Sequence, residues 1–436
     1  MKLKSENGLS RRSFVSKLVG GIAGGALGLS ALEKSLAFSN TPAPLPKPKG
    51  SLDENFWKMV RNQFVLRRDK IYMNTSGLGP SPRVVIDTLI KSTLNLEEEG
   101  EHGHNLVHEV NKNAAAFLGC LPEEIAITRN TTEGMNIIAR GLPLKKGDEV
   151  LMTTHEHPGG AVPWLALAND IGIKIKMFEP GSTKQEMIDL VKKNITKKTR
   201  VLSVCHIPCT VGFIYPVKEF AEICRNNNIY YVLDGAHPPG MIPFNLHETG
   251  ADFYAMSGHK WLLGPKGTGF LYIRKEMFKH WKPRHVGAYS EKKYEFENLV
   301  FEHKHEASTI EYGTRNTAIA LALGAAINFI DTIGIENVAA RGKAMADYFL
   351  AELLQMPELL TVLTPMEESS RASVITFKPK NMLYTDLQGK IAEEANIRLR
   401  GINEHKLNAI RCSFHVFNSF DEVDKLLFTI KKILSA

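Results

Sequence analysis

Short apolar runs alternate with amphipathic, helix-forming stretches along most of the chain. The apolar runs with strand character are Ile125–Thr128, Asp148–Thr153, Lys174–Phe178, Val201–Cys205 and Tyr230–Leu233. Stretches with helical periodicity are Val110–Leu118, Glu133–Arg140, Lys184–Asn194 and Val217–Asn226. Short apolar strands separated by helices predict an α/β fold whose largely parallel sheet is covered on both faces. Ligands of such sheets bind beyond the carboxyl ends of the strands, so the loops that follow these strands are the places to look for chemistry.

The last quarter of the chain predicts a second, smaller α/β unit. A long helix rich in alanine, leucine and isoleucine begins after Thr317 and reaches about Ile333. In the final helix, Ser419 and Glu422 form a capping box ahead of one apolar face. We therefore expect a large domain over residues 71–330 and a small C-terminal domain over residues 331–436.

The first 37 residues have the three parts of an export signal. A twin-arginine pattern occupies Ser10–Val15, a glycine-rich apolar run covers Gly20–Leu32, and Ser35–Ala37 supplies a small-x-small cleavage site. This pattern predicts recognition by the Tat export machinery and a periplasmic location. The alternatives are an uncleaved anchor or a chance arginine pair. Residues 38–70, which begin with regularly spaced prolines, are expected to form a spacer and an N-terminal arm.

Net charge and cysteine content exclude several classes of function. The chain carries a formal charge of +7, but the first 37 residues hold six basic and two acidic side chains, so the remainder is close to neutral. We find no basic stripe interleaved with aromatic residues and expect no nucleic-acid partner. The five cysteines lack the spacing of a disulfide framework. Cys205, His206 and Cys209 are interpreted as small buried side chains after a strand, so no metal site is expected.

The most informative segment for chemistry is the glycine-rich stretch from Ser257 to Gly269, which contains Lys260. A lysine that forms a Schiff base must lose its proton, so it needs a partly desolvated, cation-rich setting. The small polar residue Ser257 and the imidazole of His259 can hydrogen-bond a phosphate. Taken alone, a lysine in such a loop is usually a surface turn, and the functional interpretation depends on what other loops supply.

Two other loops supply matching parts. Asp234 follows an apolar run, and a carboxylate at the carboxyl end of a strand can pair with a protonated pyridine nitrogen, which makes the ring an electron sink. In Thr128–Gly134 a strand gives way to a helix, and the hydroxyls and N–H groups of a helix N-terminus can hold a phosphate. Each feature is weak alone, since a strand-end Asp can cap a helix and a threonine can simply be an N-cap.

In their order along the chain, these segments resemble the class V aminotransferase family of fold-type I enzymes that use pyridoxal 5′-phosphate (PLP). The resemblance runs from about Tyr72 to the C-terminus, and Ser257–Lys260 is its most specific part. It implies a large domain with a mostly parallel, seven-stranded sheet and a smaller C-terminal α/β domain. It also implies roles for particular residues: Lys260 carries the cofactor, Asp234 pairs with the pyridine nitrogen, His157 stacks on the ring, His237 lies near the phenolic oxygen, and Thr131, Thr132, Ser257 and His259 hold the phosphate.

The resemblance extends to the substrate and to a partner subunit. The segment Glu311–Asn316 matches one that family members lend across a dimer interface, so Thr314 would reach the partner's phosphate in a homodimer with shared sites. Arg411 is the expected clamp for the α-carboxylate of an amino acid, because a guanidinium can grip a carboxylate through two parallel hydrogen bonds. A surface arginine in a strand is the alternative. Asn74 is assigned to the loop that closes over the substrate.

One departure from the family decides the expected activity. Cysteine desulfurases of this family carry a reactive cysteine ahead of the carboxylate arginine, whereas this chain has no cysteine in 398–405. The sequence therefore favours an aminotransferase or an epimerase acting at the α-carbon of an amino acid. A C–S or β-lyase, or a cysteine desulfurase-like enzyme, is the alternative. A non-catalytic PLP-binding protein and a sugar aminotransferase are rivals that the expected carboxylate clamp disfavours.

Overall fold

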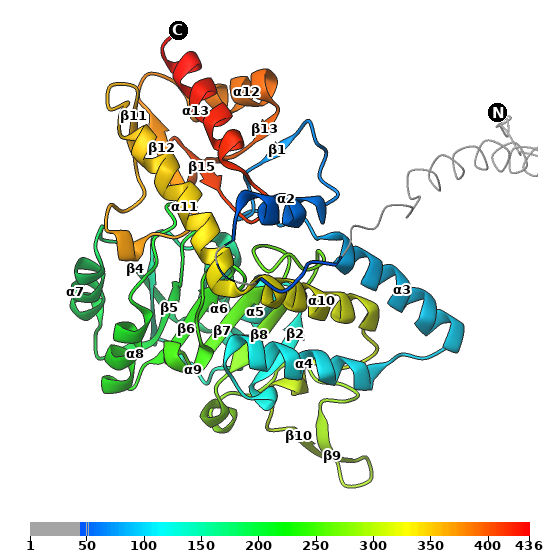
Figure 1. Cartoon of the computed structure of the whole chain (residues 1–436). Helices are drawn as coiled ribbons and strands as arrows, with labels where there is room; N and C mark the ends of the chain where they lie inside the picture. Colours follow the sequence, from blue (N-terminus) through cyan, green and yellow to red (C-terminus); the bar gives the residue numbers. More distant parts are fainter. Residues whose placement is uncertain (1–43, 49, 51) are drawn as a thin grey trace, which may run out of the picture. The chain divides into compact units, whose positions relative to one another are not determined.

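The computed structural model of the chain describes residues 44–48, 50 and 52–436, and Figure 1 shows how its elements are arranged. The export signal predicted for residues 1–37 lies outside the described residues. The domain boundaries given above stay predictions, because they rest on the sequence pattern. Among the described residues, no single helix is long and apolar enough to cross a membrane, and only the bent pair formed by residues 317–333 and 335–353 would qualify by length and composition.

A seven-stranded sheet forms the centre of the large domain. Its order is β2 (Ile125–Thr128), β8 (Gly269–Ile273), β7 (Phe253–Ser257), β6 (Tyr230–Gly235), β5 (Thr199–Cys205), β3 (Glu149–Thr153) and β4 (Lys174–Phe178). Neighbouring strands run parallel except at β8, which is antiparallel to both β2 and β7. The prediction of an α/β fold with a mostly parallel, seven-stranded sheet is confirmed.

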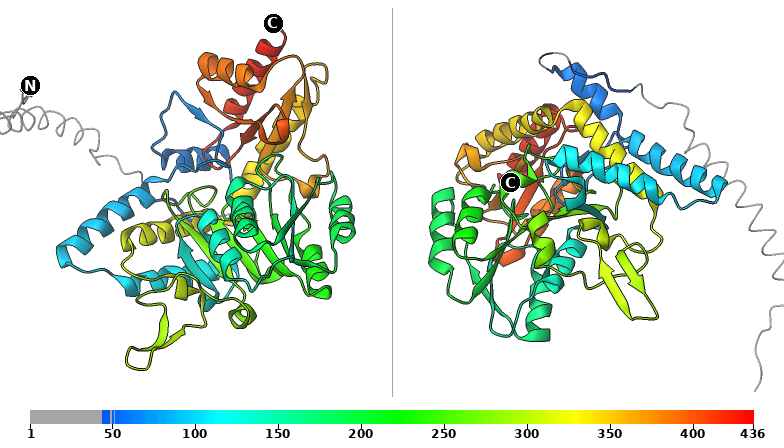
Figure 2. Two further views of the ribbon diagram at one scale, coloured as in Figure 1. Left: turned by 180° about the vertical axis from the view of Figure 1, so that it is seen from behind. Right: turned by 90° about the horizontal axis from the view of Figure 1, so that it is seen from below.

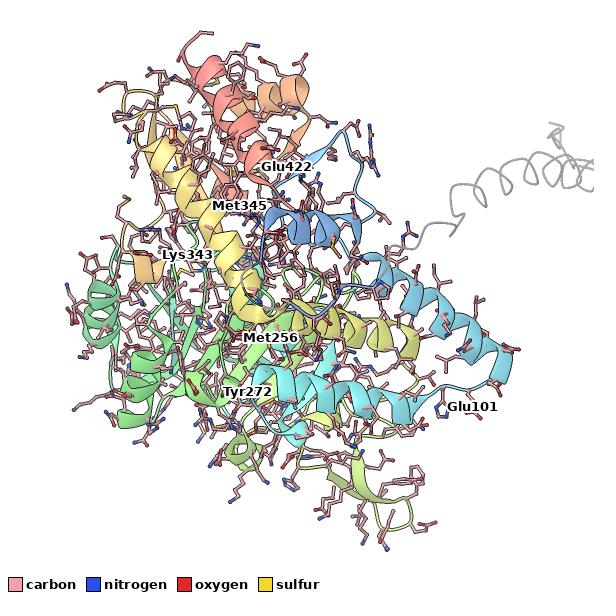
Figure 3. All side chains as sticks on the ribbon, viewed as in Figure 1. Glu101, Met256, Tyr272, Lys343, Met345 and Glu422 are labelled. Carbon is pink, nitrogen blue, oxygen red and sulfur yellow. The ribbon has the colours of Figure 1, made fainter. Side chains whose placement is uncertain are left out.

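Each face of this sheet packs against its own layer of helices. One layer consists of α4 (His104–Leu118), α7 (Lys184–Asn194), α8 (Val217–Asn226) and α10 (Thr317–Ile333), and the other of α5 (Thr131–Gly141) and α6 (Pro158–Ile171). Successive side chains of a strand point to opposite faces of the sheet, so consecutive strand residues pack against different helix layers. Met256 and Tyr272, labelled in Figure 3, lie in the apolar core on the side of the first helix layer, and their neighbours Ala255 and Leu271 lie in the core on the side of the second. Both faces are thus buried, which explains the continuous apolar runs in the sequence.

A smaller lobe is built on a four-stranded antiparallel sheet (Figure 2). The strands lie in the order β11 (Leu360–Val362), β12 (Val374–Pro379), β15 (Ala409–Ser413) and β14 (Arg400–Ile402), with α11 (Ile335–Leu353), α12 (Tyr384–Ala395) and α13 (Phe420–Leu434) packed on them. Met345, labelled in Figure 3, lies in the core of this lobe. The predicted capping box of the last helix is present, with Ser419 as N-cap and Glu422 three residues on. The prediction of a smaller C-terminal α/β lobe is confirmed.

Peripheral elements complete the structure. These are α2 (Glu54–Asn62), α3 (Arg83–Glu99), α9 (Leu246–Thr249) and the hairpin of β9 (Glu291–Glu295) and β10 (Val300–His303). The two-residue strand β1 (Ile71–Tyr72) pairs in parallel with β13 (Ile397–Arg398), which ties the chain entering the large domain to the small lobe. The segment that follows β1 is therefore placed beside both the small lobe and the large sheet.

Candidate functional site

Lys260 lies in the loop that joins β7 to β8, and the N-terminal segment 72–80 packs directly against it. The Gly79 amide donates to the carbonyl of His259 over 2.8 Å, and a Cβ on Gly79 would stand 1.8 Å from the Lys260 carbonyl oxygen. Only a glycine permits this approach. Burial lowers the pKa of the Lys260 amine, and the charge of Arg411 lowers it further, while Asp234 acts in the opposite direction. The site thus favours the neutral amine that Schiff-base chemistry requires.

Asp234 stands at the carboxyl end of β6 with its carboxylate buried. The Ala236 amide donates to Oδ1 over 3.0 Å, and the other oxygen, Oδ2, faces Gly160, where a Cβ would lie only 2.8 Å away. Burial raises the pKa of this carboxyl, and the charges of Lys260 and His157 lower it. A side chain at position 160 would crowd the carboxylate. The glycine there leaves Oδ2 accessible to the cationic nitrogen of a flat ring.

His157 is the N-cap of α6 and lies near the same carboxylate. Its Nδ1 accepts a hydrogen bond from the Gly159 amide over 3.0 Å, so the neutral ring carries its proton on Nε2. Burial and the charge of Lys260 lower the pKa of this imidazole. A neutral aromatic ring held by its helix cap is suited to stack on a cofactor ring, as the sequence resemblance implies.

The residues predicted to hold a phosphate converge from two loops. The hydroxyls of Thr131 and Ser257 are hydrogen-bonded over 2.7 Å, although they are 126 positions apart in the chain. Thr132 is exposed, and its hydroxyl would be 2.4 Å from a Cβ at Gly159. Nδ1 of His259 lies 3.0 Å from the Thr268 carbonyl, to which it donates, so Nε2 is left as the acceptor or donor for a ligand.

The N-terminus of α5 is capped by Asn130, whose side chain accepts from the Glu133 amide. From the sequence, Thr131 or Thr132 could simply be the N-cap of this helix. In the structure another residue does the capping, so the hydroxyls of Thr131 and Thr132 are available for a ligand at the positive end of the helix.

Arg411 is a fully buried cation that projects from β15. Its Nη1 donates to the Cys209 carbonyl over 2.8 Å, and its Nη2 donates to Oδ1 of Asn74 over 3.0 Å. Its Nε is buried and has no hydrogen-bond partner among the described residues. Burial lowers the pKa of this guanidinium to about 10, so it keeps its charge at neutral pH. Asn74 thus touches the expected clamp, and an unsatisfied donor of a buried guanidinium is the kind of group that a bound carboxylate satisfies.

His237 is buried below the same segment. Its Nε2 lies 3.2 Å from the Ser76 carbonyl, and its Nδ1 is buried with no partner in the part of the chain that the structure describes. Burial, with the charges of Lys260 and Arg411, holds the pKa of this imidazole well below its usual value. Because Nε2 donates to the carbonyl, the neutral ring has Nδ1 as an acceptor, which suits a ligand hydroxyl.

Thr314 is the one candidate that the structure does not bring to the site. It is exposed between β10 and α10 and makes no hydrogen bond with any of the described residues. Its predicted role needs a second subunit and therefore stays a prediction.

Three polar groups near the site were missed by sequence reasoning. The Glu156 carboxyl accepts from the Thr153 hydroxyl over 2.5 Å and from the Cys205 thiol over 2.9 Å, and burial raises its pKa to about 7. Arg400 and Glu404 form an ion pair of 2.5 Å in the segment without a cysteine. The position of Glu156 next to His157 was a usable signal, whereas the strand register that places Arg400 is not readable from the sequence.

The described residues fit PLP on their own geometry. Orphaned buried polar atoms, the Nδ1 of His237 and the Nε of Arg411, line a site that also has a carboxylate, a lysine of lowered pKa and paired hydroxyls at a helix N-terminus. When bound, PLP supplies an electron sink for electrons released at the α-carbon of an amino acid.

Comparison with known proteins identifies the family. The model of the aminotransferase class-V family matches residues 80–426. A protein of Pyrococcus abyssi named probable cysteine desulfurase is 28% identical over 399 residues, which cover 86% of this chain and 97% of the relative. The structure of a cysteine desulfurase from Thermococcus onnurineus NA1 superposes with a TM-score of 0.79 at 26% identity, covering 89% of this chain and 99% of that one.

A second structural relative is the cystine C–S lyase C-DES. Its complex with the reaction product cysteine persulfide superposes with a TM-score of 0.77 at 25% identity, covering 83% of this chain and 97% of that one. Another structure of C-DES has glycine covalently linked to its PLP cofactor and matches with a TM-score of 0.78 at 26% identity, over 85% of this chain and 98% of that one. These relatives confirm the predicted cofactor and the fold-type I architecture.

The comparisons also correct the expected activity. The sequence favoured an aminotransferase or epimerase, but the relatives are cysteine desulfurases and a C–S lyase, which supports the alternative instead. That preference was wrong because these reactions share the same lysine, carboxylate and arginine and differ only in where one proton or leaving group goes. The missing cysteine does not exclude this chemistry, because a C–S bond can be cleaved without a thiol on the protein.

The matched model spans most of the chain, and its segments carry Lys260, Asp234 and Arg411. The chain belongs to the aminotransferase class-V family and is a PLP-dependent enzyme.

Proposed function

We propose that this enzyme is a PLP-dependent C–S lyase that acts on a sulfur-containing amino acid. The observation that carries the proposal is the buried guanidinium of Arg411, whose Nε lacks a partner and whose charge acts on the amine of Lys260. An α-carboxylate bound there would present the α-carbon to the lysine. The names of the relatives then favour C–S cleavage as the outcome.

The protein residues have separate tasks in this reaction. Lys260, as a neutral amine, takes the proton from the α-carbon, and its lowered pKa fits a general base. With PLP bound, Asp234 would hold a positive charge on the ring nitrogen, and the hydrogen bond of Arg411 with Asn74 would fix the direction of the guanidinium that binds the carboxylate. The backbone contact of Gly79 with the Lys260 loop packs the N-terminal segment against the backbone of the lysine.

The route by which sulfur leaves distinguishes a lyase from a desulfurase. A desulfurase needs a protein thiolate as sulfur acceptor, and Cys209 is a thiol on which the charges of both Lys260 and Arg411 act. It is only 5% exposed, and burial raises its pKa, so the thiol keeps its proton and is a poor nucleophile. We therefore favour elimination, in which the sulfur leaves with the group it carries. For L-cystine and water, the products are pyruvate, ammonia and cysteine persulfide.

Product analysis tests this function. The holoenzyme is incubated with L-cystine or L-cysteine, and pyruvate and alanine are quantified together with persulfide. The proposal predicts pyruvate and small-molecule persulfide in equal amounts from L-cystine, and no product with Lys260→Ala. Formation of alanine with a persulfide on the protein would contradict elimination, and formation of a sulfur-containing 2-oxo acid would contradict C–S cleavage.

We further propose a homodimer with shared sites. The support is Thr314, which is exposed in the single chain, as is Tyr312 two residues earlier, at 41%. Thr314→Arg would place a bulky cation in such an interface and should shift the mass measured by light scattering from dimer to monomer, whereas a dimer that persists would argue against this interface.

Export by the Tat machinery to the periplasm is also a proposal, supported by Arg11 and Arg12 of the predicted signal. Replacing both arginines by lysine should retain the protein in the cytoplasm, as judged by cell fractionation, and unchanged export would contradict the proposal.

A further inference from the structure

The small sheet turns one of its faces toward the lysine loop. Along β15, Ile410 and Cys412 lie in the core of the small lobe, so Arg411 and Ser413 point to the opposite face. The Ser413 hydroxyl is 2.9 Å from that of Ser76, which belongs to the N-terminal segment that packs on the lysine loop. The side chains of this second face are therefore directed at the candidate site.

Thr376 lies on the same face of the sheet, in the neighbouring strand β12. It is directly opposite Arg411 in the antiparallel pair, whereas Ile375 and Phe377 on either side of it lie in the core of the small lobe. Residues in this relation have Cβ atoms about 5 Å apart. The threonine and the arginine thus lie side by side, and both are fully buried.

The hydroxyl is the unsatisfied group of Thr376. Its backbone N–H donates to the Thr364 hydroxyl over 2.8 Å, and its carbonyl accepts from the Leu363 amide over 2.8 Å. Neither its hydroxyl nor the adjacent Nε of Arg411 has a hydrogen-bond partner among the described residues, so the two groups are not bonded to each other. Because buried polar groups are normally paired, two unpaired neighbours are suited to share one ligand.

Packing does not explain a threonine at this position. Valine has nearly the shape of threonine and is also enriched in strands, whereas a buried hydroxyl without a partner costs folding stability. Val374, two residues earlier on the same face, packs with Trp261, so this face accommodates a valine. A polar group that is kept in a core position at a cost to stability is typical of a functional site.

We propose that Thr376 is a second binding residue for the α-carboxylate of the substrate. The carboxylate would accept one hydrogen bond from Nε of Arg411 and another from the Thr376 hydroxyl. A carboxylate has about four lone-pair sites on its two oxygens, so it can accept from both groups together. The inference deepens the proposed function, because it rests on an amino acid site but not on the fate of the sulfur.

Amine binding measures this contact. Kd is read from the absorbance of bound PLP for L-alanine and for isopropylamine, in which a methyl group replaces the carboxylate. Thr376→Val should raise the Kd for L-alanine about 10-fold, through loss of one hydrogen bond to a charged group, and leave that for isopropylamine unchanged. Thr376→Ser keeps the hydroxyl and should bind L-alanine like the wild type. A Kd for L-alanine within twofold of wild type in Thr376→Val, or an equal rise for both amines, would overturn the proposal.

Thermal denaturation separates a binding role from a structural one. Because the hydroxyl is unpaired in the protein alone, Thr376→Val should keep or raise the Tm of the holoenzyme without amino acid while it weakens alanine binding. A lower Tm together with unchanged binding would contradict the proposal. The matched control is Thr361→Val, because Thr361 is exposed on the adjacent strand β11 and its replacement should change neither Kd.

A double-mutant cycle tests whether Thr376 and Arg411 bind the same group. If they share one carboxylate, Thr376→Val should raise the Kd for L-alanine much less in an Arg411→Met background than in the wild type. Equal increases in both backgrounds would show that the hydroxyl acts elsewhere and would overturn the proposal. L-Alanine carries no sulfur, so these results are independent of C–S cleavage. If no sulfur amino acid yields pyruvate while the alanine results hold, the proposed function is wrong and the role of Thr376 stands.

Discussion

Replacement of Arg411 by methionine tests directly whether the guanidinium binds the α-carboxylate of the substrate. Methionine is unbranched, fills much of the space of the arginine stem and carries no charge, so the substitution removes the guanidinium with little loss of packing. In the wild-type enzyme this guanidinium has five N–H donors, of which one is used by the Cys209 carbonyl and one by Asn74. Three remain, including the buried Nε without a partner, and an α-carboxylate needs two.

The size of the effect follows from these donors. A hydrogen bond to a charged group contributes about 1.5–3 kcal/mol, so loss of a two-bond grip costs about 3 kcal/mol, or roughly 150-fold in affinity. The carbonyl of Cys209 and the amide oxygen of Asn74 lose their donor too, which costs some folding stability. The relief of a fully buried cation offsets part of that cost.

The assay separates binding from folding and from cofactor retention. The Kd for amino acid is read from the absorbance of bound PLP, with PLP content and thermal denaturation as controls, in wild type, Arg411→Met and Arg411→Lys. We expect Kd to rise about 100-fold in Arg411→Met, with Arg411→Lys in between because lysine keeps the charge but not the fork. A Kd within threefold of wild type in a folded, PLP-loaded Arg411→Met protein would refute the clamp.

Three other variants test the remaining assignments. Asp234→Asn should keep PLP bound but lower kcat by about 100-fold, the effect of losing about two pKa units on the ring nitrogen; a loss below threefold would contradict the pairing. Cys209→Ser should keep pyruvate as the product, because a buried thiol of raised pKa is not the sulfur acceptor, and a switch away from elimination in product analysis would argue otherwise. Burial raises the pKa of Glu156 from 4.5 to about 7, so the stability that the protonated carboxyl contributes is complete below pH 4.5 and is lost as the pH rises to about 7. Glu156→Gln should therefore gain stability relative to wild type across that window in urea unfolding, and a constant difference would contradict the burial of this carboxyl.

Much of the fold was predictable because its signals are local. The strands around Leu151, Leu202 and Leu233 are buried on both faces, and such strands read as continuous apolar runs between helices. The capping box of Ser419 and Glu422 needs only four residues to be recognised, and it is present.

The site was predictable only in part, because some of its contacts join distant positions. Thr131 and Ser257, 126 residues apart, were assigned to one phosphate through the family resemblance and not through their spacing. The register that puts Arg400 opposite Arg411 depends on a hairpin whose turn has three left-handed residues, and no sequence rule specifies such a turn without glycine. The activity was not predictable at all, because the competing reactions use the same residues and differ in the fate of a single bond.

Every role proposed for the surrounding residues depends on attachment of the cofactor to Lys260. Purified holoenzyme is reduced with borohydride, digested and analysed by mass spectrometry to find the lysine that retains the pyridoxyl group. We expect modification at Lys260 alone and none in Lys260→Ala. Modification of a different lysine in the wild-type enzyme, or retention of the group in Lys260→Ala, would contradict it.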